Sequence, residues 1–398
     1  MGCRLGSSRL ILATAPFAIL TVSFSLSCSG GRDNSLTATD VQEAMARKDW
    51  PRAQRLLDRL TQIGLPDRDL VALKAELELG RGQPERAIQI LLAVPDSEPH
   101  AAACRQVAGQ IERRRDRLRP AEAHFLDALR LNGRLLPARR ELILIYGMQA
   151  RRRELNEQFR ALGDIEPLKY DDVLLWTASL EDIWNNDTIE GDLRRYLAAD
   201  PDDQASRRAL ATVLLRAGRL EEAAPHVERL PEGDVEGSLL KAQLAMSRGD
   251  LDQVRSLAAG GPRKHVGFAK LRGMLAARSG ALDDAIEEYR AALALDPTDR
   301  EANQGLSLAL RQAGKRQEAD ALAKKADLWR SLSGLLVKAR GPQGRQDREL
   351  LRQLGETCKS LGRDAEAVAW FRLVLVLDPL DEAAQRAIYR LTNRPGAP

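Results

Sequence analysis

The sequence is poor in the residue types that build catalytic and metal centres. Its 398 residues include only 4 cysteines and 4 histidines. No HExxH, CxxC or glycine-rich phosphate-binding motif occurs, although zinc, redox and nucleotide sites of the common kinds use those spacings. Nothing in the sequence positions a Ser/His/Asp triad. We therefore expect no catalytic, metal or cofactor site, and a protein that is not an enzyme.

Aromatic residues are also scarce, and basic and acidic residues are nearly balanced. Aromatic residues make up 4% of the chain, and 61 Lys and Arg face 57 Asp and Glu. This near-balance argues against a general nucleic-acid-binding protein, which usually carries a basic surplus. With 30% charged residues and many alanines and leucines, the composition suits helices that pack closely through small and aliphatic side chains.

The segment GALDDAIEEYRAALALDP, residues 280–297, shows the pattern that dominates the chain. Apolar residues fall at i, i+4, i+7 and i+8 from Ala285 to Leu293, which is the apolar stripe of an amphipathic helix. Asp283 and Asp284 stand in its first turn, where carboxylates favour the positive end of the helix dipole. Pro297 cannot continue the helix.

The same spacing of apolar residues recurs along the chain. A small or apolar anchor residue is followed by an aromatic residue or leucine four positions later, and by another small or apolar residue three positions after that. The first six anchors are evenly spaced, and the next four follow at similar steps except for a longer last one. The helix at 280–297 is therefore one copy of about ten. The anchors are Ala53, Ala87, Ala121, Leu155, Ile189, Ala223, Val254, Ala285, Ala319 and Ala367.

A first helix and a tight turn precede each anchor helix. Glycines stand five residues before five of the anchors, where a left-handed residue ends a helix. Prolines stand at the start of three anchor helices, where a missing N–H costs least. Each unit is thus predicted to be helix, turn, helix. The glycines are Gly82, Gly218, Gly280, Gly314 and Gly362, and the prolines are Pro51, Pro84 and Pro120.

The stretch LLRQLGETCKSLGRDAEAVAWFRLVLVLDP, residues 350–379, resembles the tetratricopeptide repeat family. Segments from Ala209 and Gly305 match its pattern more loosely. The resemblance implies an all-α, right-handed α-solenoid of about ten repeats with a C-terminal capping helix. Such an array buries surface only between neighbouring repeats and has no central core. The residues that fit the family spacing are Leu354, Gly355, Gly362, Ala367, Phe371 and Pro379.

The repeats divide the chain into segments. Repeats anchored at Leu155, Ile189 and Val254 lack the small anchor, so their boundaries are soft. The long step before Ala367 predicts a lengthened helix and then a Gly/Pro loop. The predicted segments are an export signal at 1–27, a tether at 28–38, nine repeats at 39–333, an insertion at 334–347, the last repeat at 348–380, and a capping helix and tail at 381–398.

Two local features refine this division. Thr39 and Gln42 have the spacing of a capping box that opens the first helix. Cys104 and Cys358 lie several repeats apart, whereas a disulfide requires Cα atoms within about 7 Å. We expect both to be free, packed thiols.

The N-terminus has the pattern of an export signal. Arg4 and Arg9 precede an uncharged run at 10–31. The segment FSLSC resembles a bacterial lipoprotein signal, in which the cysteine, here Cys28, becomes the lipid-carrying first residue of the mature chain. Ser25 stands where that family usually has leucine. The resemblance implies lipidation at Cys28 and a membrane-associated lipoprotein of the bacterial cell envelope, facing the periplasm or the exterior.

Three other fates of this segment remain open. Ordinary signal cleavage would release a secreted protein. A run of about 20 apolar residues is long enough to span a bilayer as an uncleaved signal anchor, although Pro16 and several hydroxyl residues favour a processed signal. Gly2 and Cys3 are acylation candidates at the cytoplasmic face, but Gly6 stands where the myristoylation motif requires Ser or Thr.

Charge is polarised locally. Residues 112–160 hold 13 arginines and 7 acidic residues, whereas residues 171–203 hold 2 arginines and 10 acidic residues. We expect arginines at 113–119 and 151–153 to end first helices in adjacent repeats and to form a basic edge. That edge is either solvated at favourable helix C-termini or a contact for anionic lipid or an acidic partner. Its residues are Arg117, Arg119, Arg151 and Arg153.

A second set of basic residues follows from the resemblance. In tetratricopeptide arrays the first helices line a concave groove, and the fifth and thirteenth positions of the unit usually face it. A basic groove suits an acidic segment or a peptide carboxylate. The implied groove residues are Arg140, Arg208, Lys270 and Arg352 at the fifth position, and Arg114, Arg216 and Arg278 at the thirteenth.

These features together predict a non-enzymatic scaffold that is tethered by lipid at Cys28. Partner proteins or peptides, possibly acidic, would dock on its concave face, and no nucleic acid is expected. Two alternatives stay open. One is a soluble or intracellular tetratricopeptide adaptor, with RNA contact included. The other is an assembly factor for an enzyme complex of the envelope.

Overall fold

The computed structural model describes residues 36–179 and 186–393. The export signal and Cys28 lie outside the described residues. All regular secondary structure within the described ranges is helical. None of the described helices is both long and apolar enough to cross a membrane. The chain divides into two compact units, Met1–Ala108 and Gly109–Pro398, and the division falls inside α5 (Ala101–Arg114).

The first unit consists of two helix hairpins and the start of α5. Its main core is formed by α1, α2 and α3 around the anchor Ala53, which is fully buried. Thr37 caps α1, and its N–H donates to Asp40 Oδ2 at 2.7 Å. The prediction that Thr39 and Gln42 cap this helix was therefore wrong by two residues. The helices are α1 (Ala38–Ala46), α2 (Trp50–Gln62), α3 (Asp67–Gly80) and α4 (Pro84–Leu92).

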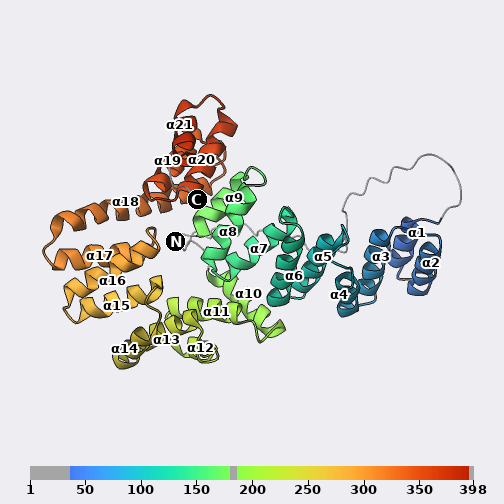
Figure 1. Cartoon of the computed structure of the whole chain (residues 1–398), viewed down its shortest axis with the longest axis horizontal. Helices are drawn as coiled ribbons and strands as arrows, with labels where there is room; N and C mark the ends of the chain where they lie inside the picture. The colour runs from blue at the N-terminus through green and yellow to red at the C-terminus, as the bar shows by residue number, and fades with distance from the viewer. Residues whose placement is uncertain (1–35, 180–185, 394–398) are drawn as a thin grey trace, which may run out of the picture. The chain divides into compact units, whose positions relative to one another are not determined.

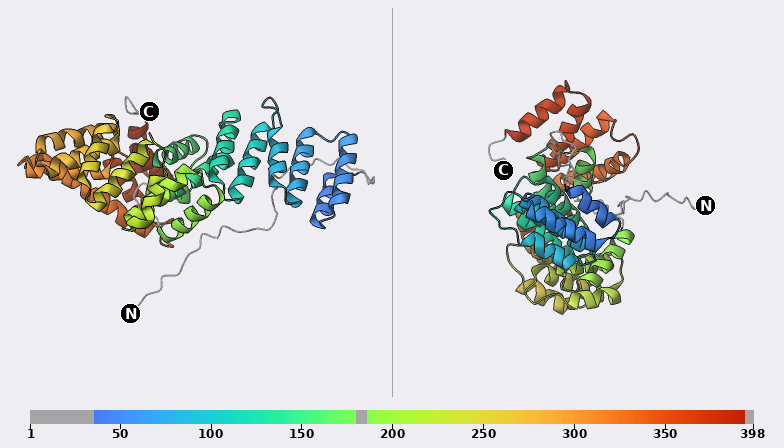
Figure 2. Two further views of the ribbon diagram at one scale, coloured as in Figure 1. Left: turned by 90° about the horizontal axis from the view of Figure 1, so that it is seen from below. Right: turned by 90° about the vertical axis from the view of Figure 1, so that its right-hand side faces the viewer.

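The second unit continues the same succession of antiparallel helix pairs (Figures 1 and 2). Its last helix, α21, packs on α20, as expected of a capping helix. The helices after α5 are α6 (Leu118–Leu131), α7 (Leu136–Met148), α8 (Arg152–Gly163), α9 (Tyr170–Ser179), α10 (Asn186–Ala199), α11 (Gln204–Arg216), α12 (Leu220–Glu228), α13 (Val235–Arg248), α14 (Leu251–Gly260), α15 (Val266–Arg278), α16 (Leu282–Leu295), α17 (Arg300–Gln312), α18 (Arg316–Ala339), α19 (Arg348–Ser360), α20 (Asp364–Leu377) and α21 (Glu382–Thr392).

The predicted anchors occupy the centre of each hairpin. Nine of the ten are at most 2% exposed, and Ile189 is partly buried. A small anchor lets the first helix of a repeat pack closely against the second helix. In the last repeat, a Cβ atom added at Gly355 of α19 would lie 2.8 Å from the ring of Phe371, which stands four residues after its anchor. The all-α solenoid of helix-turn-helix repeats is confirmed.

The turn between the two helices of a repeat takes a left-handed residue. All five predicted glycines have positive φ, from 73° at Gly218 to 81° at Gly280. Lys48, Asp116 and Ala150 occupy the same position with φ of 57°, 60° and 53°. A left-handed conformation costs a non-glycine residue about 1–2 kcal/mol. The packing of the two helices therefore imposes this turn even where the sequence lacks glycine.

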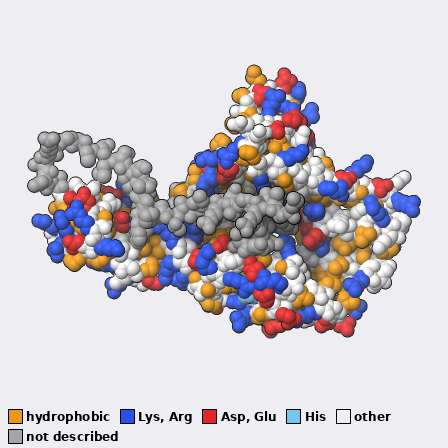
Figure 3. All heavy atoms as spheres, turned by 180° about the vertical axis from the view of Figure 1, so that it is seen from behind, with side chains coloured by type: hydrophobic (Ala, Val, Ile, Leu, Met, Phe, Trp, Pro, Cys, Tyr) orange, Lys and Arg blue, Asp and Glu red, His pale blue; other side chains and the backbone are white. Residues whose placement is uncertain are grey.

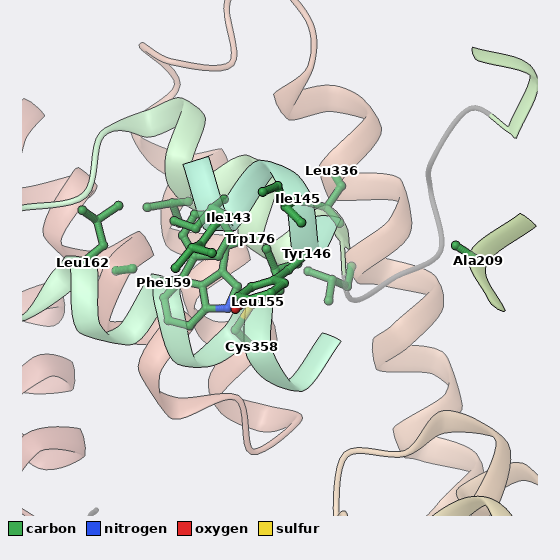
Figure 4. Close-up of a cluster of buried hydrophobic side chains, with 14 of the residues drawn as sticks. Ile143, Ile145, Tyr146, Leu155, Phe159, Leu162, Trp176, Ala209, Leu336 and Cys358 are labelled. Carbon is green, nitrogen blue, oxygen red and sulfur yellow. The ribbon is translucent and has the colours of Figure 1, made fainter. Parts of the chain in front are cut away.

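Contacts in the second unit are not restricted to neighbouring repeats. Helix α9 packs against α18 and α20, which lie beside it in Figure 1. One hydrophobic cluster joins side chains of α6 to α13 with side chains of α18 to α21. In Figure 4, Leu336 of α18 and Cys358 of α19 lie with Phe159 and Trp176 in this cluster. The expectation that surface is buried only between neighbours was wrong here, because the chain returns to α9.

Helix α18 makes this return possible. It has 24 residues, whereas the other described helices have between 9 and 14. Residues 340–347 then form turns and a bend before α19. This segment is where the long step between the last two anchors predicts a lengthened helix and a loop. The extra length carries the last repeat away from α17 and onto α9.

Candidate functional site

The four fifth-position cations are held in ion pairs between repeats. Each lies on a first helix and contacts an aspartate at the start of the first helix of the next repeat or of the capping helix. Their side chains are partly buried. The pairs are Arg140 with Asp172 at 2.8 Å, Arg208 with Asp234 at 2.7 Å, Lys270 with Asp299 at 2.9 Å, and Arg352 with Asp381 at 2.5 Å.

Two of the aspartates in these pairs also cap helices. Asp299 accepts the N–H of Ala302 at 2.7 Å, and Asp381 accepts the N–H of Ala384 at 2.9 Å. These bonds satisfy backbone donors that the first turn leaves without partners. The Ala384 N–H and the Arg352 guanidinium hold the pKa of Asp381 below its usual value. The pairs made by Asp299 and Asp381 therefore stabilise both a helix start and the stacking of two successive elements.

Lys270 shows how the ion pairs keep partly buried cations charged. Burial alone would lower its pKa, because it disfavours the ammonium ion. Glu301 and Asp299 outweigh burial and raise the pKa of Lys270 above its ordinary value. Its Nζ lies 2.7 Å from Glu301 Oε2 and 2.9 Å from Asp299 Oδ2. The fifth-position charges that the resemblance implies for a groove are thus balanced within the chain.

The thirteenth-position arginines are placed differently. Arg114, Arg216 and Arg278 are the last residues of α5, α11 and α15, and all three are exposed. A cation at a helix C-terminus is favoured by the helix dipole. The Nη1 of Arg278 lies 4.0 Å from the sulfur of Met246 in α13. Of the predicted groove residues, these three present their side chains most openly to solvent.

The basic edge is not located where the sequence analysis placed it. Arg117 and Arg151 are the N-caps of α6 and α8, and Arg119 and Arg153 stand in the first turns of those helices. The prediction that they end first helices was wrong, because the left-handed turn comes just before each N-cap, so that the four arginines belong to the second helices.

Carboxylates compensate the charge of these arginines. A cation at a helix N-terminus is disfavoured by the dipole. Arg117 Nη1 lies 3.3 Å from Glu112, and Arg151 Nη1 lies 2.6 Å from Glu122 Oε2. Arg151 also stacks over the ring of Tyr146, with 4.4 Å from its Cζ to the ring centroid. Arg151 therefore links two adjacent repeats, whereas Arg117 pairs within its own repeat.

The oppositely charged segments of the sequence pair with each other. Arg119 binds Asp200 through two bonds of 3.0 and 3.1 Å, and Asp116 lies 2.9 Å from Arg195. Burial opposes ionisation of Asp200, but Arg119 lowers the pKa of this carboxyl below its usual value. Basic and acidic side chains are interspersed over the face seen in Figure 3. Ion pairs therefore link the basic and the acidic segments within the fold.

Sequence reasoning missed a buried polar network between α7 and α11. Asp203, the N-cap of α11, is 2% exposed. Its Oδ2 accepts from Ser206 Oγ at 2.6 Å and from Gln149 Nε2 at 3.3 Å. An aspartate before a helix is a recognisable cap signal. Nothing in the sequence indicates that Gln149, which belongs to an earlier repeat, completes the network.

The other candidate sites are the two cysteines, any metal-binding group and the surface depressions. Cys104 and Cys358 are buried thiols that are not joined in a disulfide, as predicted, and burial raises the pKa of the Cys104 thiol. Among the described residues, no group of three or more His, Cys, Asp or Glu side chains is arranged to hold a metal ion. One surface depression is lined by residues of α6 that include His124, and another by residues of α19 and α21 that include Lys359. Neither contains a predicted groove residue.

Comparison with known proteins supports the repeat assignment over part of the chain. Residues 190–236 and 239–300 match the family model described as tetratricopeptide repeat. These stretches run from α10 to the start of α17, and they include the unit anchored at Val254. No curated protein matches the chain.

Several solved helical structures are similar. The APC/C hetero-tetramer Cut9-Hcn1 aligns at 16% identity over 90% of this chain and 84% of that chain, with a TM-score of 0.35. Yeast Tom70 aligns at 12% identity over 88% and 86%, with a TM-score of 0.32. A human IFIT1 dimer with PPP-AAAA aligns at 14% identity over 90% and 92%, with a TM-score of 0.34.

The fold and the matched repeats define the class of protein. It is an α-solenoid of helix-turn-helix repeats in which the two matched stretches are similar to tetratricopeptide repeats, and such repeats indicate a scaffold for protein–protein interaction. The Arg216 and Arg278 side chains, exposed at the ends of first helices, both lie within the matched stretches.

Proposed function

We propose that this protein is an exported scaffold, anchored by lipid at Cys28 in a bacterial cell envelope, which docks acidic segments of partner proteins along its first helices. The export signal and the FSLSC segment support the location. The lipid keeps the array at the membrane and raises its effective concentration there. No step of this proposal requires an enzymatic activity.

One observation carries the docking proposal. Arg216 and Arg278 end the first helices of two repeats and are exposed, whereas the side chains of Arg208 and Lys270 on the same two helices are partly buried. An arginine presents paired donors that suit a carboxylate. An acidic segment that contacts both helices would therefore bind the thirteenth-position arginines rather than the fifth-position cations.

Charge reversal at Arg216 and Arg278 is expected to weaken such a partner by at least tenfold. Each charge-assisted hydrogen bond contributes about 1.5–3 kcal/mol, and reversal adds repulsion between like charges. The partner is first identified by chemical cross-linking in intact cells and mass spectrometry. Its dissociation constant is then measured for the wild-type chain and for the Arg216→Glu, Arg278→Glu variant.

The matched control reverses two exposed arginines outside the first helices. Arg255 lies on α14 and Arg263 lies in the turn after it, and their side chains are 63% and 86% exposed. The Arg255→Glu, Arg263→Glu variant should bind as the wild type does. Equal affinity of all three proteins would remove the docking proposal. Reversal of Arg208 or Lys270 is a poorer test, because it also breaks the pairs with Asp234 and Asp299.

A further inference from the structure

Two adjacent first helices, α15 and α17, carry apolar side chains at a position that is polar in most repeats. The ninth position of the unit, eleven residues before the anchor, is polar in six of the ten repeats. Met274 and Leu308 occupy it in successive repeats, and Leu308 is 58% exposed. Burial within the fold therefore does not account for this leucine. The polar residues are Gln42, Glu76, Gln110, Thr212, Gln243 and Glu356.

Side chains at the ninth position of successive repeats come close to each other. In the first two repeats, Gln42 Nε2 lies 3.5 Å from Glu76 Oε2, and these residues are 34 positions apart. The same spacing separates Met274 from Leu308, and α15 contacts α17 (Figure 1). Met274 and Leu308 therefore occupy equivalent places on adjacent helices and belong to one apolar surface.

An ion pair shows which faces of α15 and α17 form this surface. Lys270 Nζ on α15 lies 2.7 Å from Glu301 Oε2 on α17. Met274 follows Lys270 by four residues, and Leu308 follows Glu301 by seven. Residues spaced by four or seven share one face of a helix. The apolar side chains therefore lie on the same faces as this ion pair between the two helices.

Two arginines border the apolar surface. Arg278 follows Met274 by four residues and Arg311 follows Leu308 by three, and both arginines are exposed. Among residues 36–179 and 186–393, no carboxylate lies within ion-pair distance of either arginine. Arg278 Nη1 lies 4.0 Å from the sulfur of Met246, which is partly buried on α13. These five residues, here called the apolar–basic strip, thus extend over α13, α15 and α17.

The strip has the chemistry and the dimensions to bind an acidic amphipathic helix. Leucine and methionine offer apolar contacts, and methionine adapts its shape to different partners. Arg278 and Arg311 stand on helices of the kind that pack about 8–10 Å apart. On a helix, acidic residues seven positions apart are separated by about 10.5 Å and share one face. Apolar residues between them would then contact the strip, as in other helix-in-groove complexes.

We propose that the apolar–basic strip binds an amphipathic helix of a partner protein. Two acidic residues of that helix, seven positions apart, pair with Arg278 and Arg311, and apolar side chains between them pack on Met274 and Leu308. This inference rests on the proposed docking of acidic segments and identifies the segment as a helix rather than an extended tail.

The test uses short synthetic peptides that are held helical by a staple on the face away from the strip. Each carries the same leucines and two glutamates, which are four, seven or eleven positions apart. Fluorescence anisotropy measures their binding to the full chain in nanodiscs of neutral lipid, with empty nanodiscs as the blank. The spacing of seven should bind about tenfold more tightly than the other two, because only this spacing satisfies both arginines.

Leu308→Glu separates this inference from the docking proposal. It should weaken the peptide with the spacing of seven by at least tenfold, since it places a carboxylate against the peptide's leucines and glutamates. The matched control is Leu295→Glu, which changes a leucine at the end of the second helix α16 that is 46% exposed. This control should bind as the wild type does.

Three results would overturn the inference: no binding by any peptide, equal binding at all three spacings, or equal affinity of Leu308→Glu and Leu295→Glu. A natural partner that still depends on Arg216 and Arg278 would in that case leave the docking proposal standing. Sedimentation of the chain is measured in parallel. A wild-type dimer that Leu308→Glu converts to a monomer would assign the strip to a second copy of the chain and also overturn the inference.

Discussion

Replacement of Asp203 by alanine is expected to lower the free energy of unfolding by about 3 kcal/mol. The change removes an N-cap, which costs about 1 kcal/mol. It also removes the acceptor of the buried Ser206 hydroxyl and one of the two acceptors of the Gln149 amide, which costs about 1–3 kcal/mol more. Asp203 Oδ1 accepts the N–H groups of Ala205 and Ser206, both at 3.1 Å. Urea unfolding of the full chain in detergent, followed by circular dichroism, measures the loss.

The control for this variant is Asp250→Ala. Asp250 caps α14 by accepting the N–H of Gln253 at 3.0 Å, but it is exposed, and no buried amide depends on it. Its loss should cost about 1 kcal/mol. If both variants lose the same free energy, the network between α7 and α11 does not stabilise the stacking of these repeats.

Substitution of Gly355 by alanine is expected to destabilise the last repeat by about 1–3 kcal/mol, the usual cost of overpacking. The added Cβ would lie 2.8 Å from the Phe371 ring, and Phe371 is 1% exposed, so its ring has little room to move. The shift in the thermal unfolding midpoint of the segment that contains α19 and α20 measures the effect.

The same substitution elsewhere should have the opposite sign. Gly334 lies inside α18, and a Cβ atom added there meets no atom within 4 Å. Gly334→Ala should stabilise α18 by about 0.5–1 kcal/mol, since alanine has the higher helix propensity. Destabilisation by both variants would contradict the view that Gly355 is required for close approach of the two helices.

The repeats were predictable because they are encoded locally. Small anchors such as Ala285, and turn glycines such as Gly218, each report on a contact or a conformation within a single repeat. The left-handed turns at Asp116 and Ala150 were missed, because no glycine marks them. The missing glycines also explain why the arginines after those turns were assigned to the wrong helices.

The return of the chain onto α9 was not predictable in the same way. A periodic pattern tells which face of a helix is apolar, and neighbouring repeats usually cover that face. Trp370 and Thr177 form a hydrogen bond across 193 positions, and neither residue departs from its local pattern. The length of α18 was visible in the spacing of the anchors, but the spacing does not give the direction in which that helix carries the last repeat.

The cations at the fifth and thirteenth positions differ in their exposure, for a physical reason that the sequence does not reveal. Positions five and thirteen both carry cations, but the cation at position five faces an aspartate at the start of the next element, as Lys270 faces the capping Asp299. Position thirteen ends its helix, and Arg216 there is exposed. A count of basic residues per repeat therefore overstates the charge that the first helices offer to a partner.

The central claim, an exported scaffold anchored at Cys28, is tested most directly by intact-mass and peptide analysis of the mature N-terminus, from membrane fractions of the native cell or a close host. We expect a chain that begins at Cys28 and carries added acyl mass. An intact Met1, or a soluble chain with a free N-terminus elsewhere, would contradict the claim.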